Sequence, residues 1–154
     1  MKPGTFTQIY IQFVFSPLHR DRLLHQSIRP AIFKYMSGII TQLGHKSIIV
    51  NGMSDHVHLF IGLNPNLSVS ETVKEIKRAS SVFINEQHFF SGKFQWQGGY
   101  AGFSYSHSHI DKVYNYILNQ EKHHSKTTFR DEYMDFLNKY QIEFQNQYLF
   151  DFFD

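Results

Sequence analysis

The feature that most constrains the fold is the order of two kinds of hydrophobic periodicity along the first two thirds of the chain. In some segments apolar and polar residues alternate, as in strands, whereas in others apolar residues recur every three to four positions, as in amphipathic helices. Strand periodicity covers residues 6–15, 46–51, 56–63 and 94–106, and helical periodicity covers 27–43 and 69–88. The predicted order is therefore strand, helix, strand, strand, helix, strand.

This order is that of the split β-α-β, or ferredoxin-like, plan. It predicts an α+β fold with an antiparallel sheet and packed helices. The 154 residues suffice for one domain and are too few for two ordinary ones, so we expect a single domain over 1–154. Two more helices are predicted at about 108–123 and 129–140. An aromatic tail follows within 141–154, too apolar at 148–153 to float free, and we expect it to cover its own domain or a dimer partner.

Local signals support the predicted elements and their ends. Ser27 is a candidate cap for the first helix, Pro30 fits its first turn and Gly44 ends it. Ser68 and Glu71 form a capping-box pattern at the start of the second helix. A turn through Gly52 and Asp55 should join the two middle strands. The apolar stripe predicted for the first helix consists of Ile28, Ile32, Tyr35, Ile39 and Leu43.

Composition narrows the classes of function. With no cysteine, the chain has neither a disulfide framework nor a thiolate metal site or nucleophile. No apolar run approaches the roughly 18 residues of a membrane helix, and the first residues lack the apolar region of a signal peptide. These features predict a cytoplasmic protein with no membrane partner. A net charge of +2 permits a nucleic-acid partner without requiring one, and 10 histidines draw attention to imidazole chemistry.

The first candidate site is His56-Val57-His58 on the third predicted strand. Alternate residues of a strand point to the same face, so the two imidazoles lie side by side with Cα atoms about 7 Å apart. Such a pair can bind a divalent metal and leave room for other ligands. Chance alone explains some patterns of this kind in a histidine-rich chain, and His107-Ser108-His109 is a second one, at a strand-to-helix junction.

The second candidate site is the helix that carries Tyr116 and Gln120, which lie four residues apart and share a face. On a continuous helix Tyr116 lies about 40° from Gln120, whereas Tyr114 lies about 120° away. Gln120 could offer an amide oxygen to a metal beside Tyr116. An ordinary amphipathic helix with half-buried tyrosines is the alternative interpretation of the same spacing.

Together these segments carry a family resemblance. The motifs, in chain order, are Asp55-His56-Val57-His58-Leu59-Phe60, Trp96, Gly99-Tyr100, Tyr116-Ile117-Leu118-Asn119-Gln120 and His123-His124. In this order they resemble the single-tyrosine HUH transposases of the smallest bacterial insertion sequences, including the REP-associated tyrosine transposases, over about residues 5–149.

The resemblance implies a transposase that cuts and rejoins single-stranded or hairpin DNA at element ends, close to the nucleoid. By motif position Tyr116 would be the nucleophile that forms a 5′-phosphotyrosine, and His56, His58 and Gln120 would hold Mg²⁺ or Mn²⁺. Members of the family work as homodimers. Transesterification conserves bond energy, so ATP is not needed, and the sequence contains no P-loop motif.

Other interpretations stay open at this stage. A non-catalytic ferredoxin-like nucleic-acid-binding module shares the predicted topology, and a domesticated endonuclease that acts on chromosomal repeats shares the motifs. A histidine-based phosphoesterase is a third, although Phe60 stands where a further alternate histidine is expected. For DNA binding, Lys74, Lys77 and Arg78 have the spacing of one helix face and could meet phosphates. The spacing favours the alternative, a solvated face on which they pair with Glu71 and Glu75.

Overall fold

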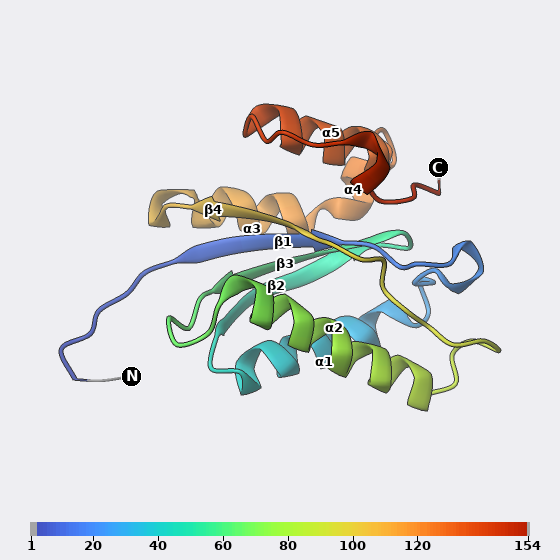
Figure 1. Ribbon diagram of the computed structural model, residues 1–154, viewed down its shortest axis with the longest axis horizontal. Coiled ribbons are helices and arrows are strands. Elements are labelled where there is room, and N and C mark those ends of the chain that lie inside the picture. Colours follow the sequence, from blue (N-terminus) through green and yellow to red (C-terminus); the bar gives the residue numbers. More distant parts are fainter. Residues whose placement is uncertain (1–2, 154) are drawn as a thin grey trace.

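In the computed structural model, which describes residues 3–153, four strands form one antiparallel sheet (Figure 1). The strand order is β2-β3-β1-β4. Because β1 lies between β3 and β4, this is the ferredoxin-like arrangement, and the predicted α+β fold class is confirmed. Met1, Lys2 and Asp154, which belong to the predicted 1–154 domain, lie outside the described residues. The strands are β1 (Tyr10–Phe15), β2 (Lys46–Met53), β3 (His56–Gly62) and β4 (Ala101–Tyr105).

Helices cover the sheet on both faces (Figure 1). On one face lie α1 (Arg29–Gln42) and α2 (Val69–Glu86). On the other lie α3 (Ile110–Leu118), α4 (Gln120–His124) and α5 (Phe129–Lys139). Among residues 3–153, no helix has the length and apolar character needed to cross a membrane.

The main core lies between the sheet and the pair α1 and α2. Successive strand residues point to opposite faces, so the odd-numbered residues of β1 and β3 enter this core. These are Phe13, Phe15, Val57, Leu59 and Ile61, which are fully buried against Ile32, Met36, Ile40, Val73 and Ile76. The even-numbered residues therefore face α3, α4 and α5, and among them Gln12, His56 and His58 are polar yet buried. The fold thus buries a polar cluster between the sheet and the helices α3, α4 and α5.

The first strand and helix differ from the prediction at their ends. The strand begins at Tyr10 rather than at residue 6, and Phe6 is 91% exposed. Ser27 does not cap α1, because the helix begins one residue later, after Ile28, without a side-chain cap. Tyr35 is exposed and stacks on Phe83 instead of entering the stripe, where Phe33, Met36 and Ile40 are buried. Pro30 in the first turn and Gly44 at the end, with a φ of +85°, are as predicted.

The remaining signals are confirmed in part. The hydroxyl of Ser68 accepts a hydrogen bond from the Glu71 amide, as the capping-box pattern predicts. Gly52 lies within β2 rather than in the turn, which consists of residues 54 and 55. A Cβ atom there would lie 2.3 Å from the carbonyl oxygen of His56, so glycine permits the close approach of the two strands. Of the segment 94–106, only β4 is a regular strand, and Trp96 forms an isolated bridge with Pro17.

The aromatic tail packs on its own domain. Phe150 is buried, with its ring centroid 5.1 Å from that of Tyr133 on α5. The ring of Phe152 lies 5.5 Å from Phe129 and beneath the guanidinium of Arg130, 4.8 Å from its centre. Of the two alternatives predicted for the tail, the structure shows cover of the chain's own domain.

Candidate active site

His56 and His58 lie side by side on β3, with ring centroids 5.1 Å apart, and both are fully buried. The Nδ1 atom of His56 lies 2.8 Å from a carboxylate oxygen of Asp55, and that of His58 lies 2.7 Å from Oε1 of Gln12. Because these oxygens only accept, each Nδ1 donates the hydrogen. A neutral ring then keeps an unprotonated Nε2, which is the form that binds metals. Burial lowers the pKa of His58, which favours the neutral ring.

Both Nε2 atoms face one carboxylate, that of Glu132 on α5. Its Oε1 lies 3.0 Å from Nε2 of His58 and 3.4 Å from Nε2 of His56. Oε1 of Gln120 lies 2.9 Å from the same nitrogen of His56, so the predicted pair of histidines and the predicted glutamine meet. Glu132, which is not among the predicted site residues, completes a buried group of three potential metal ligands with the histidines.

The other carboxylate oxygen of Glu132 faces the tyrosine. The Tyr116 hydroxyl donates a hydrogen bond to Oε2, and the Gln120 amide nitrogen donates to the same atom over 3.2 Å. Nε2 of His124 lies 3.2 Å from Oε2 and Nε2 of His123 lies 3.5 Å from it. Burial and the negative charge of Glu132 raise the pKa of Tyr116 above its ordinary value. The hydroxyl therefore keeps its proton in this arrangement at neutral pH.

Tyr116 and Gln120 reach the site from two helices rather than one. The predicted helix 108–123 is interrupted at Asn119, between α3 and α4. The side-chain amide of Asn51 on β2 donates to the carbonyls of Ile117, over 2.8 Å, and Leu118, over 3.3 Å. A continuous helix would use these carbonyls for its own hydrogen bonds. The continuous helix on which Tyr116 and Gln120 were predicted to share a face is therefore not formed, and Tyr116 reaches the site through its contact with Glu132.

Helix α5 closes the site from above the sheet (Figure 1). The ring of Phe129 stacks on His56, with centroids 4.2 Å apart and planes 4° apart. The tail residues Phe150 and Phe152 pack on Phe129 in turn. This contact orients the His56 ring and excludes water from its outer face.

The cluster has the composition of a cation site. Two imidazole nitrogens with outward hydrogen bonds, an amide oxygen and a carboxylate all face one another in a buried space. Acceptor groups repel one another unless protons or a cation lie between them. Nitrogen and oxygen ligands of this kind suit divalent ions such as Mn²⁺ and Mg²⁺. The residues present therefore fit a divalent metal.

The basic residues predicted to contact DNA lie elsewhere. Lys74, Lys77 and Arg78 are on α2, across the sheet from His56 and His58. The ammonium of Lys77 donates to the backbone carbonyls of Gln97 and Gly99. Arg78 pairs with Glu75 at the surface. The structure does not bring these three residues to the candidate site, and phosphate contact by them stays a prediction.

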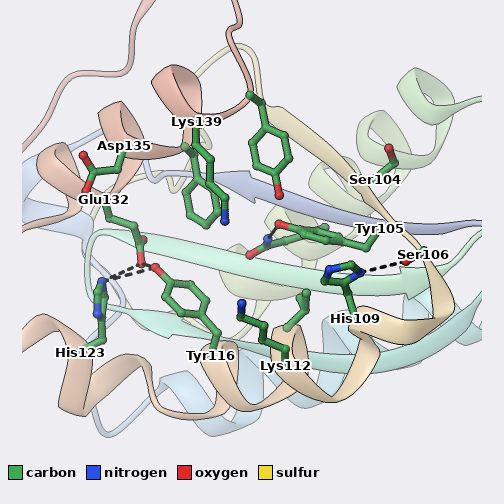
Figure 2. Close-up of a pocket in the computed structure, with 14 residues that line it drawn as sticks. Ser104, Tyr105, Ser106, His109, Lys112, Tyr116, His123, Glu132, Asp135 and Lys139 are labelled. Carbon is green, nitrogen blue, oxygen red and sulfur yellow. Dashed lines mark hydrogen bonds and ion pairs between the residues drawn. The ribbon is translucent and has the colours of Figure 1, made fainter.

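A pocket opens beside Tyr116, between β4, α3 and α5 (Figure 2). It has a volume of about 570 Å³. Glu132, His123 and Tyr116 lie together at one end of it, and Lys112 and Lys139 point into it from opposite sides. The candidate site is thus reached from one side through a space large enough for a small ligand.

Comparison with known proteins identifies the family to which the chain belongs. The family model of IS200-like transposases matches residues 5–120. The chain belongs to this family of transposases. No protein of curated function matches the sequence.

Two solved structures share the fold. A candidate transposase from Deinococcus radiodurans has 23% sequence identity and a TM-score of 0.60, and the match covers 78% of this chain and 96% of that one. A REP-associated tyrosine transposase bound to a REP hairpin has 12% identity and a TM-score of 0.58, with 82% of this chain and 76% of that one covered. Both matches support the α+β fold.

Proposed function

We propose that this transposase cuts and rejoins single-stranded DNA through a covalent 5′-phosphotyrosine on Tyr116, with Mg²⁺ or Mn²⁺ as cofactor. The observation that carries the proposal is that the Tyr116 hydroxyl binds the same carboxylate as His56 and His58. A nucleophile and a set of metal ligands in one cluster are what phosphodiester transfer requires. Membership of the IS200-like family supports the same conclusion.

His56, His58 and Gln120 would hold the metal, and Glu132 is placed to join them. When bound, a divalent ion draws electrons from the scissile phosphate and offsets its negative charge. The neutral imidazoles and the amide do not cancel that charge, which makes them suitable ligands for this purpose.

The residues of the chain account for the proton and the bond changes. Tyr116 Oη attacks the phosphorus, a new O–P bond forms, and the bond from phosphorus to the 3′ oxygen breaks. The Tyr116 proton has an acceptor already in contact, Oε2 of Glu132. The departing 3′ oxygen takes up one proton, which balances the one that Tyr116 gives to Glu132, and leaves as a hydroxyl. Attack by a 3′ hydroxyl on the phosphotyrosine reverses the sequence, so no ATP is consumed.

The experiment that tests this proposal is covalent capture. The protein is incubated with labelled single-stranded DNA containing a hairpin, with Mn²⁺ or Mg²⁺, and separated under denaturing conditions. A labelled species at the summed mass of protein and DNA strand is expected, and EDTA should prevent it. DNA that binds reversibly and never becomes covalently attached would instead identify a non-catalytic nucleic-acid-binding module.

A second candidate function is that of a domesticated endonuclease acting on chromosomal repeats. Its support is the structural match to a transposase bound to a REP hairpin. The two functions share the chemistry and differ in the target. Cleavage beside hairpins that recur across the host chromosome, rather than at the ends of a mobile element, would favour the second.

A homodimer is retained as part of the proposal. Its support is the family resemblance alone, because the aromatic tail is used within its own domain. Tyr116, Gln120 and both histidines meet within one chain. We therefore propose that each chain of a dimer completes its own site.

A further inference from the structure

The pocket beside Tyr116 has a wall of aromatic rings that the proposed cleavage chemistry does not use. Tyr105 from β4, Phe136 from α5 and Tyr140, the residue just after α5, line it. The Tyr105 hydroxyl accepts a hydrogen bond of 2.9 Å from the Gln12 amide. The ring of Tyr140 stacks on Phe103 with centroids 4.8 Å apart. The rings are therefore fixed in place before any ligand enters.

Cationic groups stand at the rim of the same pocket. Lys112 on α3 and Lys139 on α5 are exposed and point into the space from opposite sides (Figure 2). The acidic lining groups are Asp135, and Glu132, whose oxygens are occupied by His58 and Tyr116. The rim can therefore receive an anion while the wall receives a flat aromatic group.

A nucleotide has both of these parts. Bases stack on aromatic side chains whatever their sequence, and lysines bind the phosphate. The volume of about 570 Å³ lies within the range of about 300–1,000 Å³ that is common for small-ligand sites. A nucleotide in this pocket would also lie next to the Tyr116 hydroxyl, at the place where the scissile phosphate must arrive.

We propose that this pocket binds the nucleotide adjacent to the scissile phosphate, with its base against Tyr105 and Tyr140 and a phosphate between Lys112 and Lys139. The inference rests on the proposed function, since it names a subsite for the same substrate. Gln12 connects the two sites, because its amide group contacts His58 through Oε1 and Tyr105 through Nε2. One side chain, that of Gln12, thus fixes the position of Tyr105 relative to that of His58.

The test uses deoxyribonucleoside 5′-monophosphates as probes, with amide chemical shifts of the full chain as the readout. Shifts should concentrate on residues of β4, α3 and α5 that line the pocket. Deoxyribose 5-phosphate, which lacks only the base, should bind roughly tenfold more weakly, the effect of losing a stacked base. Equal binding of the two probes, or shifts confined to other surfaces, would overturn the inference.

Variants separate the two halves of the pocket. Lys112→Ala and Lys139→Ala should each weaken monophosphate binding by about fivefold, whereas Lys34→Ala on the far face of the sheet should not. Tyr140→Leu should weaken it by roughly tenfold while Tyr35→Leu, which also removes a stacked ring, leaves it unchanged. Unchanged binding in the pocket variants contradicts the inference.

Because these measurements need no cleavage, they fail independently of the proposed function. Covalent capture of DNA without monophosphate binding would retain the function and remove the subsite. Monophosphate binding with the expected variant effects, but without covalent capture, would retain the subsite and remove the function.

Discussion

The Tyr116 hydroxyl and the Glu132 carboxylate form a hydrogen bond that joins α3 to α5 on the same face of the sheet. Glu132 contacts His58 through its other oxygen. One carboxylate thus lies between the proposed nucleophile and the proposed metal ligands.

Tyr116→Phe should abolish the covalent adduct and strand cleavage while leaving DNA binding intact, because it removes only the hydroxyl. Tyr114→Phe is the matched control, since Tyr114 is on the same helix and exposed. Denaturing electrophoresis with labelled single-stranded DNA, followed by peptide mapping of the adduct, checks both variants. An adduct that persists in Tyr116→Phe, or that maps to Tyr105 or Tyr114, would show that another tyrosine reacts.

Metal affinity should distinguish the ligands. His56→Ala and His58→Ala should abolish measurable Mn²⁺ binding, and Glu132→Gln should weaken it by at least about tenfold, because it removes the charge at nearly constant shape. Gln120→Ala should have a smaller effect, since water can replace an amide oxygen. Calorimetric titration with Mn²⁺ measures each variant, and the exposed His109→Ala serves as control. Undiminished cleavage in EDTA would refute the metal requirement.

Single-stranded or hairpin-bearing DNA should be cleaved, and fully duplex DNA should be inert, because the 154 residues contain no P-loop motif through which ATP could drive strand separation. Binding should weaken as salt rises, through release of counterions from the phosphates. Cleavage assays on strands of identical sequence, single and annealed, check the preference. Efficient cutting of the plain duplex would contradict it.

Lys77 should make stability depend on pH in a defined window. Burial lowers its pKa in the folded chain to about 8, from an ordinary value of 10.5. Between these values the unfolded chain binds more protons, so the free energy of unfolding should rise with pH, and the effect is absent below about pH 8. From about pH 7.5 to about pH 9.5 the rise should be about 1 kcal/mol greater than in Lys77→Met. Urea unfolding measures it, with the exposed Lys34→Met as control, and an equal rise in Lys77→Met would exclude this role.

Light scattering should give about twice the 18.2 kDa chain mass, as the homodimer proposal requires. Because Tyr116 and His56 contact the same Glu132 within one chain, mixing Tyr116→Phe with His56→Ala should not restore cleavage. Restored cleavage would show that the tyrosine acts in the partner's site. A monomer with full activity would remove the dimer from the proposal.

The sequence predicted the strand and helix order because each element carries its own hydrophobic periodicity. It also placed His56 and His58 on one face, since strand geometry is local. It did not reveal the break at Asn119, because the cause is a contact from Asn51, far away in the chain. Tertiary hydrogen bonds of this kind leave no trace in the periodicity of the helix they interrupt.

Glu132 was missed although the sequence held a signal. It lies three residues after Phe129 and four before Phe136, and therefore on the apolar stripe of α5. Burying an unpaired carboxylate there would cost free energy, so a carboxylate in that position indicates a partner inside the protein. Only the fold shows that its partners are the imidazoles of β3, because local sequence patterns do not tell over which strands α5 packs.

The contact between Asn51 and the end of α3 has a consequence for cooperativity. Asn51 is the register partner of His58, and its amide holds the carbonyls of Ile117 and Leu118, just beyond Tyr116. Local opening of the β2–β3 hairpin would therefore release the last turn of α3 at the same time. Amide hydrogens in the two segments should exchange with solvent as one unit, although more than fifty residues separate them along the chain.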